Sequence, residues 1–259
     1  MRSFLSLVGA AYARLGEYDE ANDFHRRHLA IARCQHDDSR IAEGLSNLAM
    51  MYYLKGEYAQ AEARLVEAVQ ITEEIGPSAD AASIQGNYAF ILMRLNRLED
   101  AKRAFAHAIE TTKLLDGAMQ SLIPLYNGMG DVLVRLGKYD EARTYFQRAL
   151  PLALESNDRV NEGVAHMNLA RCYVHLGDTS TARHQFDAAF TAYEGTGFLN
   201  GIGLAYEYQS EMYLAMGNGT AALDCASKAL EIAGQHDNQV MKSRLRQLIS
   251  RAQRLGVGG

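Results

Sequence analysis

The sequence is poor in the residues that interrupt helices. Among its 259 residues there are 3 prolines and no tryptophan. Proline removes a backbone hydrogen-bond donor and clashes with the preceding helical turn, so its scarcity favours long helices. Pro151 lies inside an apolar run and predicts a kink or an early end in its helix. No apolar run approaches the roughly 20 residues of a membrane-spanning helix, so we expect no membrane partner.

The cysteines are few, odd in number and far apart, which argues against a disulfide framework. They are Cys34, Cys172 and Cys225, and each lies in a helical pattern. Disulfides are rare in the cytoplasm, where thiols are kept reduced. We therefore predict a cytoplasmic protein whose thiols are reduced and lie in the core or half-buried.

Motifs that carry catalysis are also missing. The sequence has no G-x-x-x-x-G-K-[ST] phosphate loop, no H-E-x-x-H zinc motif and no G-x-S-x-G nucleophile elbow. His25 and His28 share one helix face, but no Cys, Asp or Glu completes a metal set at a fixed spacing. We expect these histidines in packing or at the surface, and we predict no enzymatic activity, catalytic residue, cofactor or metal.

The charge balance is mildly acidic. The sequence has 26 Lys and Arg against 31 Asp and Glu, a net charge of −5, which disfavours non-specific binding to nucleic acid. Five basic residues and no acidic one follow Asp237: Lys242, Arg244, Arg246, Arg251 and Arg254. We interpret them as the solvated face of a terminal helix, with contact to nucleic acid or to an acidic partner as the alternative.

A short signature returns six times along the chain. It occurs as LGEYDEA at 15–21, KGEYAQA at 55–61, LNRLEDA at 95–101, LGKYDEA at 136–142, LGDTSTA at 176–182 and MGNGTAA at 216–222. Its last alanines stand at 21, 61, 101, 142, 182 and 222, so the steps are 40, 40, 41, 40 and 40 residues. A fixed period of this size indicates a solenoid, whose units bury their apolar faces by stacking on one another.

Each unit has the pattern helix A, tight turn, helix B, with apolar residues three and four apart. The glycine of the turn suits the left-handed conformation that ends helix A, and Asn96 takes this place in the third unit. Ser39 and Asp158 are expected to cap helix N-termini. The segment 240–255 has one apolar face and is expected to cap the stack.

The predicted fold is therefore an all-α, right-handed superhelix of six helix pairs plus a C-terminal capping helix. Residues 1–237 hold the repeats, and 238–259 hold the capping helix and a frayed tail. The expected repeats span 2–38, 39–78, 79–117, 118–157, 158–197 and 198–237.

The units resemble tetratricopeptide repeats (TPRs), which carry large, small and aromatic residues at fixed places around the turn glycine. In the second unit this series reads Leu45, Leu48, Ala49, Tyr52, Gly56, Ala61, Leu65 and Ala68. Three residues depart from this series. His25 and His28 replace an aromatic residue and an alanine in the first unit, and Ala226 replaces the aromatic residue in the sixth. The resemblance implies a TPR superhelix whose concave face is lined by the A helices.

The 40-residue period exceeds the ordinary TPR period of about 34 and resembles the Pins/LGN scaffolds. The segments that carry this resemblance are DRVNEGVAHMNL at 158–169, SRIAEGLSNL at 39–48 and FHRRHLAIAR at 24–33. The Gα-binding motifs of those scaffolds do not occur in this sequence, so Gα binding is not implied.

The resemblance places a peptide-binding groove on the side of the A helices opposite the Leu/Ala/Tyr stripe. The candidate groove residues are Asn47, Met50, Tyr53, Asn87, Phe90, Arg94, Asn127, Asp131, Arg135, Asn168, Arg171 and His175. Asn47, Asn87 and Asn168 recur at one position, and an amide can both donate to and accept from a peptide unit. The alternative is an asparagine that bonds only water.

The arginines add a second feature to this groove. Their guanidinium groups, together with the apolar groove residues that precede them in the chain, suit a bound segment that has acidic residues and one aliphatic or aromatic anchor. For Arg94 and Arg135 the alternative is that each complements the dipole at the end of its helix. Arg171 lies in mid-helix, so that alternative does not apply to it.

The sequence therefore predicts a non-catalytic scaffold or adaptor that binds a peptide segment of a partner protein, without specific nucleic-acid binding. The alternative function is a peptide- or effector-sensing regulatory module. The first helix begins almost at residue 1 and presents Phe4, Leu5, Val8 and Tyr12 with nothing before them. This predicts either self-association through residues 2–33 or a chain that belongs to a longer repeat array.

Overall fold

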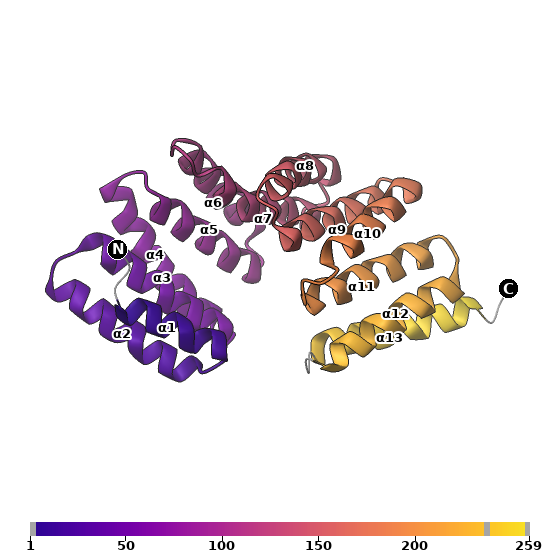
Figure 1. The fold of residues 1–259 in the computed structure, drawn as a ribbon, viewed down its shortest axis with the longest axis horizontal. Coiled ribbons are helices and arrows are strands. Elements are labelled where there is room, and N and C mark those ends of the chain that lie inside the picture. Colours follow the sequence, from indigo (N-terminus) through magenta and orange to yellow (C-terminus); the bar gives the residue numbers. More distant parts are fainter. Residues whose placement is uncertain (1–3, 236–238, 257–259) are drawn as a thin grey trace. The chain divides into compact units, whose positions relative to one another are not determined.

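The computed structural model describes residues 4–235 and 239–256, and every regular element in these ranges is helical. In chain order the helices form six pairs followed by one C-terminal helix, which confirms the all-α solenoid fold (Figure 1). The chain divides into two compact units, residues 1–136 and 137–259. The division falls at the turn inside the expected fourth repeat.

The described residues of unit 1 form seven α-helices and one short 3-10 helix. They are α1 (Phe4–Leu15), α2 (Tyr18–Cys34), α3 (Asp38–Leu54), α4 (Tyr58–Ile75), α5 (Ala79–Arg94), α6 (Leu98–Lys113), η1 (Met119–Ser121) and α7 (Leu122–Arg135). Each helix packs on the next in the chain, and α3 also contacts α1 and α5, while α5 contacts α7. The A helices α1, α3, α5 and α7 therefore form one layer, which we call the A layer of unit 1.

In the part of unit 2 that the structure describes there are six α-helices. They are α8 (Tyr139–Glu155), α9 (Arg159–His175), α10 (Thr179–Tyr193), α11 (Leu199–Ala215), α12 (Gly219–Gln235) and α13 (Gln239–Gly256). Here α11 contacts α9, and the C-terminal helix α13 packs against both α11 and α12. The expected helix over 240–255 is thus confirmed.

The turn between the helices of each pair is built as the signature predicts. Gly16, Gly56, Gly137, Gly177 and Gly217 have φ between 74° and 83°, and Asn96 has φ 58°. In this left-handed region a glycine, and next an asparagine, is least strained. The signature alanines at 21, 61, 101, 142, 182 and 222 are all 0% exposed, so any larger side chain there would meet packed atoms.

Of three local predictions, one is confirmed and two need correction. Asp37, and not Ser39, caps α3, because its carboxylate accepts from the backbone N–H of Arg40 at 3.1 Å. The Asp158 cap of α9 is confirmed by a 3.0 Å bond from the N–H of Asn161. The early end at Pro151 is wrong, because α8 continues to Glu155; the buried Ala149 and Ala153 hold its packed face on both sides of the proline.

The cysteine prediction is right for two residues and wrong for one. Cys172 and Cys225 are buried, and burial raises the pKa of their thiols to about 12 and about 11. Cys34 is exposed, because it is the last residue of α2 and lies beyond Ala32, where the buried stripe of that helix ends. All three are free thiols.

The two histidines of α2 belong to the packed interior. His25 and His28 are both buried, and the Cβ that any other residue would add at Gly9 of α1 would lie 2.6 Å from the His25 ring. Glycine at position 9 therefore makes room for a ring at position 25. No helix in the described part of the chain combines the length and the apolar character that a membrane span requires.

Candidate functional site

The A layer of unit 1 carries an apolar cleft between α3 and α5. It has a volume of about 260 Å³, and its lining includes Met50, Tyr53, Asn87 and Phe90. Met50 and Phe90 are each 37% exposed, although large apolar side chains on a packed layer are usually covered. Four of the twelve candidate residues thus lie together around one hollow.

An arginine closes one end of this cleft. The guanidinium of Arg94, at the end of α5, donates two hydrogen bonds to the Tyr53 hydroxyl, at 3.1 and 2.9 Å. Its carbon also lies 5.5 Å from the centroid of the Tyr53 ring. Arg94 therefore does more than complement a helix dipole, since it fixes an aromatic wall of the cleft and leaves an exposed cation beside it.

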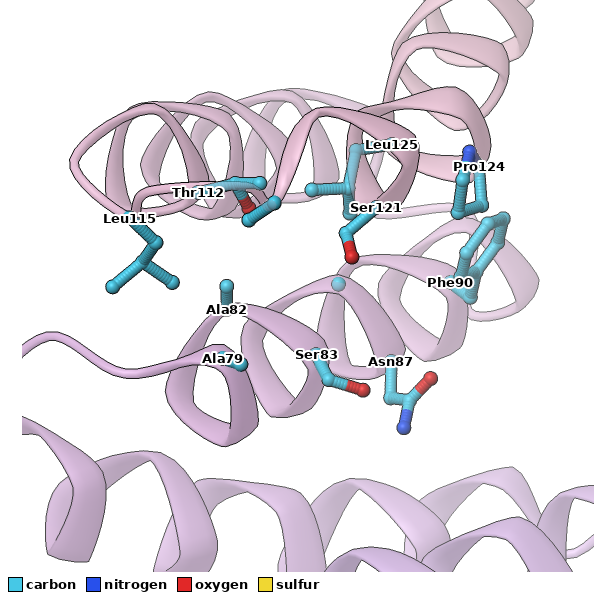
Figure 2. A pocket seen from close by; sticks show the side chains of 12 residues that line it. Ala79, Ala82, Ser83, Asn87, Phe90, Thr112, Leu115, Ser121, Pro124 and Leu125 are labelled. Carbon is cyan, nitrogen blue, oxygen red and sulfur yellow. The ribbon is translucent and has the colours of Figure 1, made fainter. Parts of the chain in front are cut away.

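A second cavity, of about 220 Å³, lies between α5 and the segment that joins α6 to α7. Figure 2 shows Asn87 and Phe90 of α5 on one side, with Leu115, Ser121, Pro124 and Leu125 on the other. Phe90 is held edge-on against Phe105 of α6, with ring centroids 5.0 Å apart. Asn87 and Phe90 line both cavities and so separate the two hollows.

Residues of the joining segment that line this cavity, such as Leu115 and Ser121, were not among the candidates predicted from sequence. The signal that points to them is the length of the link: residues 114–121 join α6 to α7, whereas residues 76–78 suffice between α4 and α5. The longer link leaves room for a cavity that the shorter link would close.

A polar depression of about 520 Å³ continues the A layer toward the N-terminal ends of α3 and α5. Its lining includes Asp37, Glu43, Asn47 and Asp80, against Arg40 as the one basic residue. Glu43 accepts a hydrogen bond from the Ser6 hydroxyl at 2.8 Å. The layer is thus acidic at this end, apolar in the middle and basic at Arg94.

Two of the three recurring asparagines bond to side chains of the preceding A helix. Asn47 donates to the Ser6 hydroxyl and Asn87 to the Ser46 hydroxyl, each at 3.2 Å and across 41 residues. The sequence led us to expect a peptide or water as the hydrogen-bond partner of these asparagines. A bond to the neighbouring helix was not expected. This bond uses one N–H of the Asn87 amide, so its carbonyl oxygen and its second N–H are left to meet a ligand.

Asn127 does not belong to this series. In the fourth repeat the asparagine position is occupied by Gly128, and Asn127 is equivalent to Ser46 and Gly86. Both polar atoms of the Asn127 side chain are buried without a partner among the described residues. On the same helix, Arg135 pairs with Asp131 at 3.4 Å and donates to the carbonyl oxygen of Met93 at 3.4 Å. This pair partly neutralises the end of α7.

The remaining candidates lie on α9 in unit 2. Arg171 donates to the Asn168 carbonyl at 2.9 Å, and its guanidinium carbon lies 4.2 Å from the centroid of the Tyr208 ring. His175 stacks on Tyr139 with centroids 4.1 Å apart. Burial, and then the charge of Arg171, lowers the pKa of His175, which is therefore neutral at pH 7.

An ion pair between a buried carboxylate and an exposed arginine joins α11 to the C-terminal helix. The Glu207 side chain is 3% exposed, and Arg244 of α13 lies 3.2 Å from its carboxylate. Burial raises the pKa of Glu207, and the charge of Arg244 opposes that rise. The Arg244 side chain is itself 54% exposed, so it lies on the solvated face of α13 and also pairs with Glu207.

The chemistry available on these surfaces is that of recognition. They offer apolar hollows, amide and hydroxyl groups and fixed guanidiniums, which orient a bound segment. In the described ranges no three His, Cys, Asp or Glu side chains gather where a metal ion would sit.

The sequence profile described as tetratricopeptide repeat matches residues 2–74, 40–113 and 121–195. The chain belongs to the tetratricopeptide repeat family. This fold generally mediates protein–protein interactions and generally serves as a non-catalytic scaffold.

Relatives of this TPR chain include kinesin light chain-related protein 2 of Arabidopsis thaliana, 25% identical over 87% of the chain and 35% of the relative. The chain spans between 24% and 40% of the length of the curated relatives that it matches.

Two solved structures share its fold. BtubC from P. vanneervenii has a TM-score of 0.68 and 19% identity, over 85% of this chain and 92% of that chain. A Rap protein complexed with competence and sporulation factor has a TM-score of 0.65 and 19% identity, over 98% and 75%.

Proposed function

We propose that the protein is a non-catalytic scaffold or adaptor that binds an extended or helical peptide segment of a partner protein on its A helices. The observation that carries the proposal is the pair of cavities, of about 260 and 220 Å³, that adjoin at Asn87 and Phe90. Each cavity suits one apolar side chain. Two such hollows, separated by an aromatic wall, suit two anchors of one segment.

The polar groups around the cavities fit the rest of such a segment. The Asn87 carbonyl oxygen accepts a backbone N–H of the peptide between its two anchors. The Arg94 guanidinium receives an acidic side chain at one end, and Glu43 and Asp80 receive a basic or amide group at the other. Asn47, Asp131 and Arg135 extend this surface in unit 1, where the polar atoms of Asn127 are buried beneath it. Asn168, Arg171 and His175 form the corresponding surface of unit 2.

Site-specific photo-crosslinking tests this proposal. A photoreactive phenylalanine analogue replaces Met50 in the apolar cleft, or Gln70 on the exposed side of α4 as a matched control. We expect partner capture from a lysate of the source organism at position 50 and not at position 70. Adding Phe90→Ala is expected to abolish capture at position 50. Stronger capture at position 70, or capture that Phe90→Ala leaves unchanged, would defeat the assignment.

The alternative is a sensing module, in which a peptide or small effector changes the arrangement of the repeats. The likeness to a Rap protein complexed with a factor supports it. Small-angle X-ray scattering with and without the captured segment separates the two functions. A scaffold keeps its radius of gyration when the segment binds, whereas a sensor changes it.

A further inference from the structure

The opposite side of α3 carries a basic cavity. Leu48 and Tyr52 lie on this side, away from Met50 and Tyr53 of the apolar cleft. Together with α2 and α4 they enclose a hollow of about 280 Å³. Three guanidiniums line it, those of Arg26 and Arg33 from α2 and of Arg64 from α4. We call this hollow the arginine cavity.

The positive charge of the arginine cavity is mostly uncompensated. Glu67 pairs with Arg33 at 2.6 Å and with Arg64 at 3.9 Å. The side chain of Arg26 forms no ion pair or hydrogen bond with any described residue. Three cations therefore face one carboxylate, which leaves two positive charges for an anion to neutralise.

This cluster is specific to the junction of the first two repeats. At the equivalent places of the next junction the sequence has Val66, Glu73 and Ala104. At the last junction it has Asp187, Glu194 and Cys225. The three arginines are therefore not a general feature that keeps the B helices solvated, since most other junctions lack the positive charge altogether.

The floor of the arginine cavity is apolar. Leu29 and Leu48 are buried, and Tyr52 is half-buried beside them. A guanidinium above an apolar floor is partly shielded from water, which strengthens its hydrogen bonds to an anion. The site therefore suits an anionic group on a hydrocarbon stem better than a bare inorganic ion.

From these observations we propose that the arginine cavity binds an anionic side chain of a protein partner, a carboxylate or a phosphate carried on an aromatic or aliphatic stem. Arg26 and Arg64 offer planar forks that match either group in a bidentate arrangement. The site is independent of the apolar cleft, because it lies on the other side of α3.

Calorimetric titration of the full chain tests this site. The probes are three short peptides that differ only at the central residue, which is phosphotyrosine, glutamate or glutamine, together with inorganic phosphate. We expect saturable binding of the phosphotyrosine or the glutamate peptide, and which of the two binds identifies the anion. Arg26→Gln combined with Arg64→Gln should weaken that binding by about tenfold or more, because each lost charge-assisted bond accounts for about that factor.

Two controls make the result specific. Arg148→Gln removes the same charge from an exposed B-helix position of unit 2 and should leave binding unchanged. Phe90→Ala disrupts the apolar cleft and should also leave it unchanged. The proposal is overturned if neither anionic peptide saturates, if the glutamine peptide binds equally well, or if the double variant binds like the wild type. Binding of inorganic phosphate without either peptide would overturn the assignment to a protein partner.

Discussion

The side-chain nitrogen of Asn87 donates a hydrogen bond to the hydroxyl oxygen of Ser46, 3.2 Å away on the preceding A helix. The same bond joins Asn47 to Ser6 one repeat earlier. An asparagine that binds a neighbouring helix through its nitrogen keeps its carbonyl oxygen at a fixed place on the surface. The bond therefore links the stacking of two repeats to the geometry of the proposed peptide site.

Replacing Asn87 by alanine, and comparing the result with Ser46→Ala, should separate the role of Asn87 in repeat stacking from its role in peptide binding. Loss of the Ser46 bond is expected to lower the free energy of unfolding by about 0.5–1.5 kcal/mol. Binding of the captured peptide should weaken by a comparable amount, measured by calorimetry at a temperature where the variant is fully folded. Ser46→Ala removes the same interhelical bond and keeps the amide. If both variants bind the peptide normally, the asparagine is purely structural.

The buried signature alanines predict that a larger side chain at these positions lowers the free energy of unfolding. Ala101 of α6 is 0% exposed, so Ala101→Leu should overpack the contact with α5 and lower the free energy of unfolding by about 1–3 kcal/mol. Ala106 on the same helix is exposed, and Ala106→Leu should change stability by no more than about 0.5 kcal/mol. Equal urea denaturation midpoints for the two variants would contradict this packing.

The fold was predictable because it repeats. Six copies of one signature specify the turn conformation, the buried alanine and the period. Where one copy departs from the signature, the other copies still identify the role of each position. Asn96 shows this well, since its place in the register identifies it as a turn residue despite the missing glycine. The early end predicted at Pro151 was wrong because local propensity was weighed without the packing of Ala149 and Ala153 around it.

The sequence predicted which face of the A helices carries the candidate site, but not the contacts that its residues make. Helical spacing places Asn87, Phe90 and Arg94 on one side of α5, but their partners depend on the register between neighbouring helices. The bonds of Arg94 to Tyr53 and of Asn87 to Ser46 each cross 41 residues, which no spacing within one helix reveals. The ion pair of Glu207 with Arg244 was not predicted for the same reason, because it depends on how α13 packs on α11.

The buried His25 of α2 predicts a loss of stability in acid. Burial, and then the charge of His28, lowers the pKa of His25 below its ordinary value of 6.5, while Glu43 of α3 opposes this. The unfolded chain therefore takes up a proton near pH 6.5 that the folded chain resists. This stability is fully present above that pH and is lost as the pH falls toward the lower folded pKa.

Hydrogen exchange of α1 and α2 measures this effect between pH 7.5 and 5.5, after correction for the intrinsic pH dependence of exchange. Protection of these helices should fall with pH more steeply than protection of α5 and α6. The double variant His25→Phe and His28→Ala restores the residue types found at the equivalent positions Phe105 and Ala108. Its protection should lose this excess pH dependence; an unchanged dependence would assign the effect to other groups.

The exposed apolar side chains of α1 predict self-association. Phe4 is 77% exposed and Leu7 is 53% exposed, and neighbouring apolar side chains of this kind favour contact between copies. Light scattering should show an average mass that rises with concentration, and Phe4→Glu with Leu7→Glu should abolish the rise. Leu154→Glu, at an exposed position of unit 2, should not. A mass that stays monomeric at high concentration would remove this expectation.

The last prediction concerns the ion pair that fastens α13 to α11. Arg244→Ala leaves the Glu207 carboxylate buried without its cation, which should lower the free energy of unfolding at pH 8 by about 1–3 kcal/mol. Because burial already raises the pKa of Glu207, removal of Arg244 should raise it further, and the carboxyl group should become neutral as the pH falls. The destabilisation should therefore be smaller at pH 5 than at pH 8. Arg244→Ala combined with Glu207→Gln should regain most of the loss at both pH values, as measured by chemical denaturation. An equal loss at both pH values in the single variant would mean that Arg244 acts through packing of its stem and not through its charge.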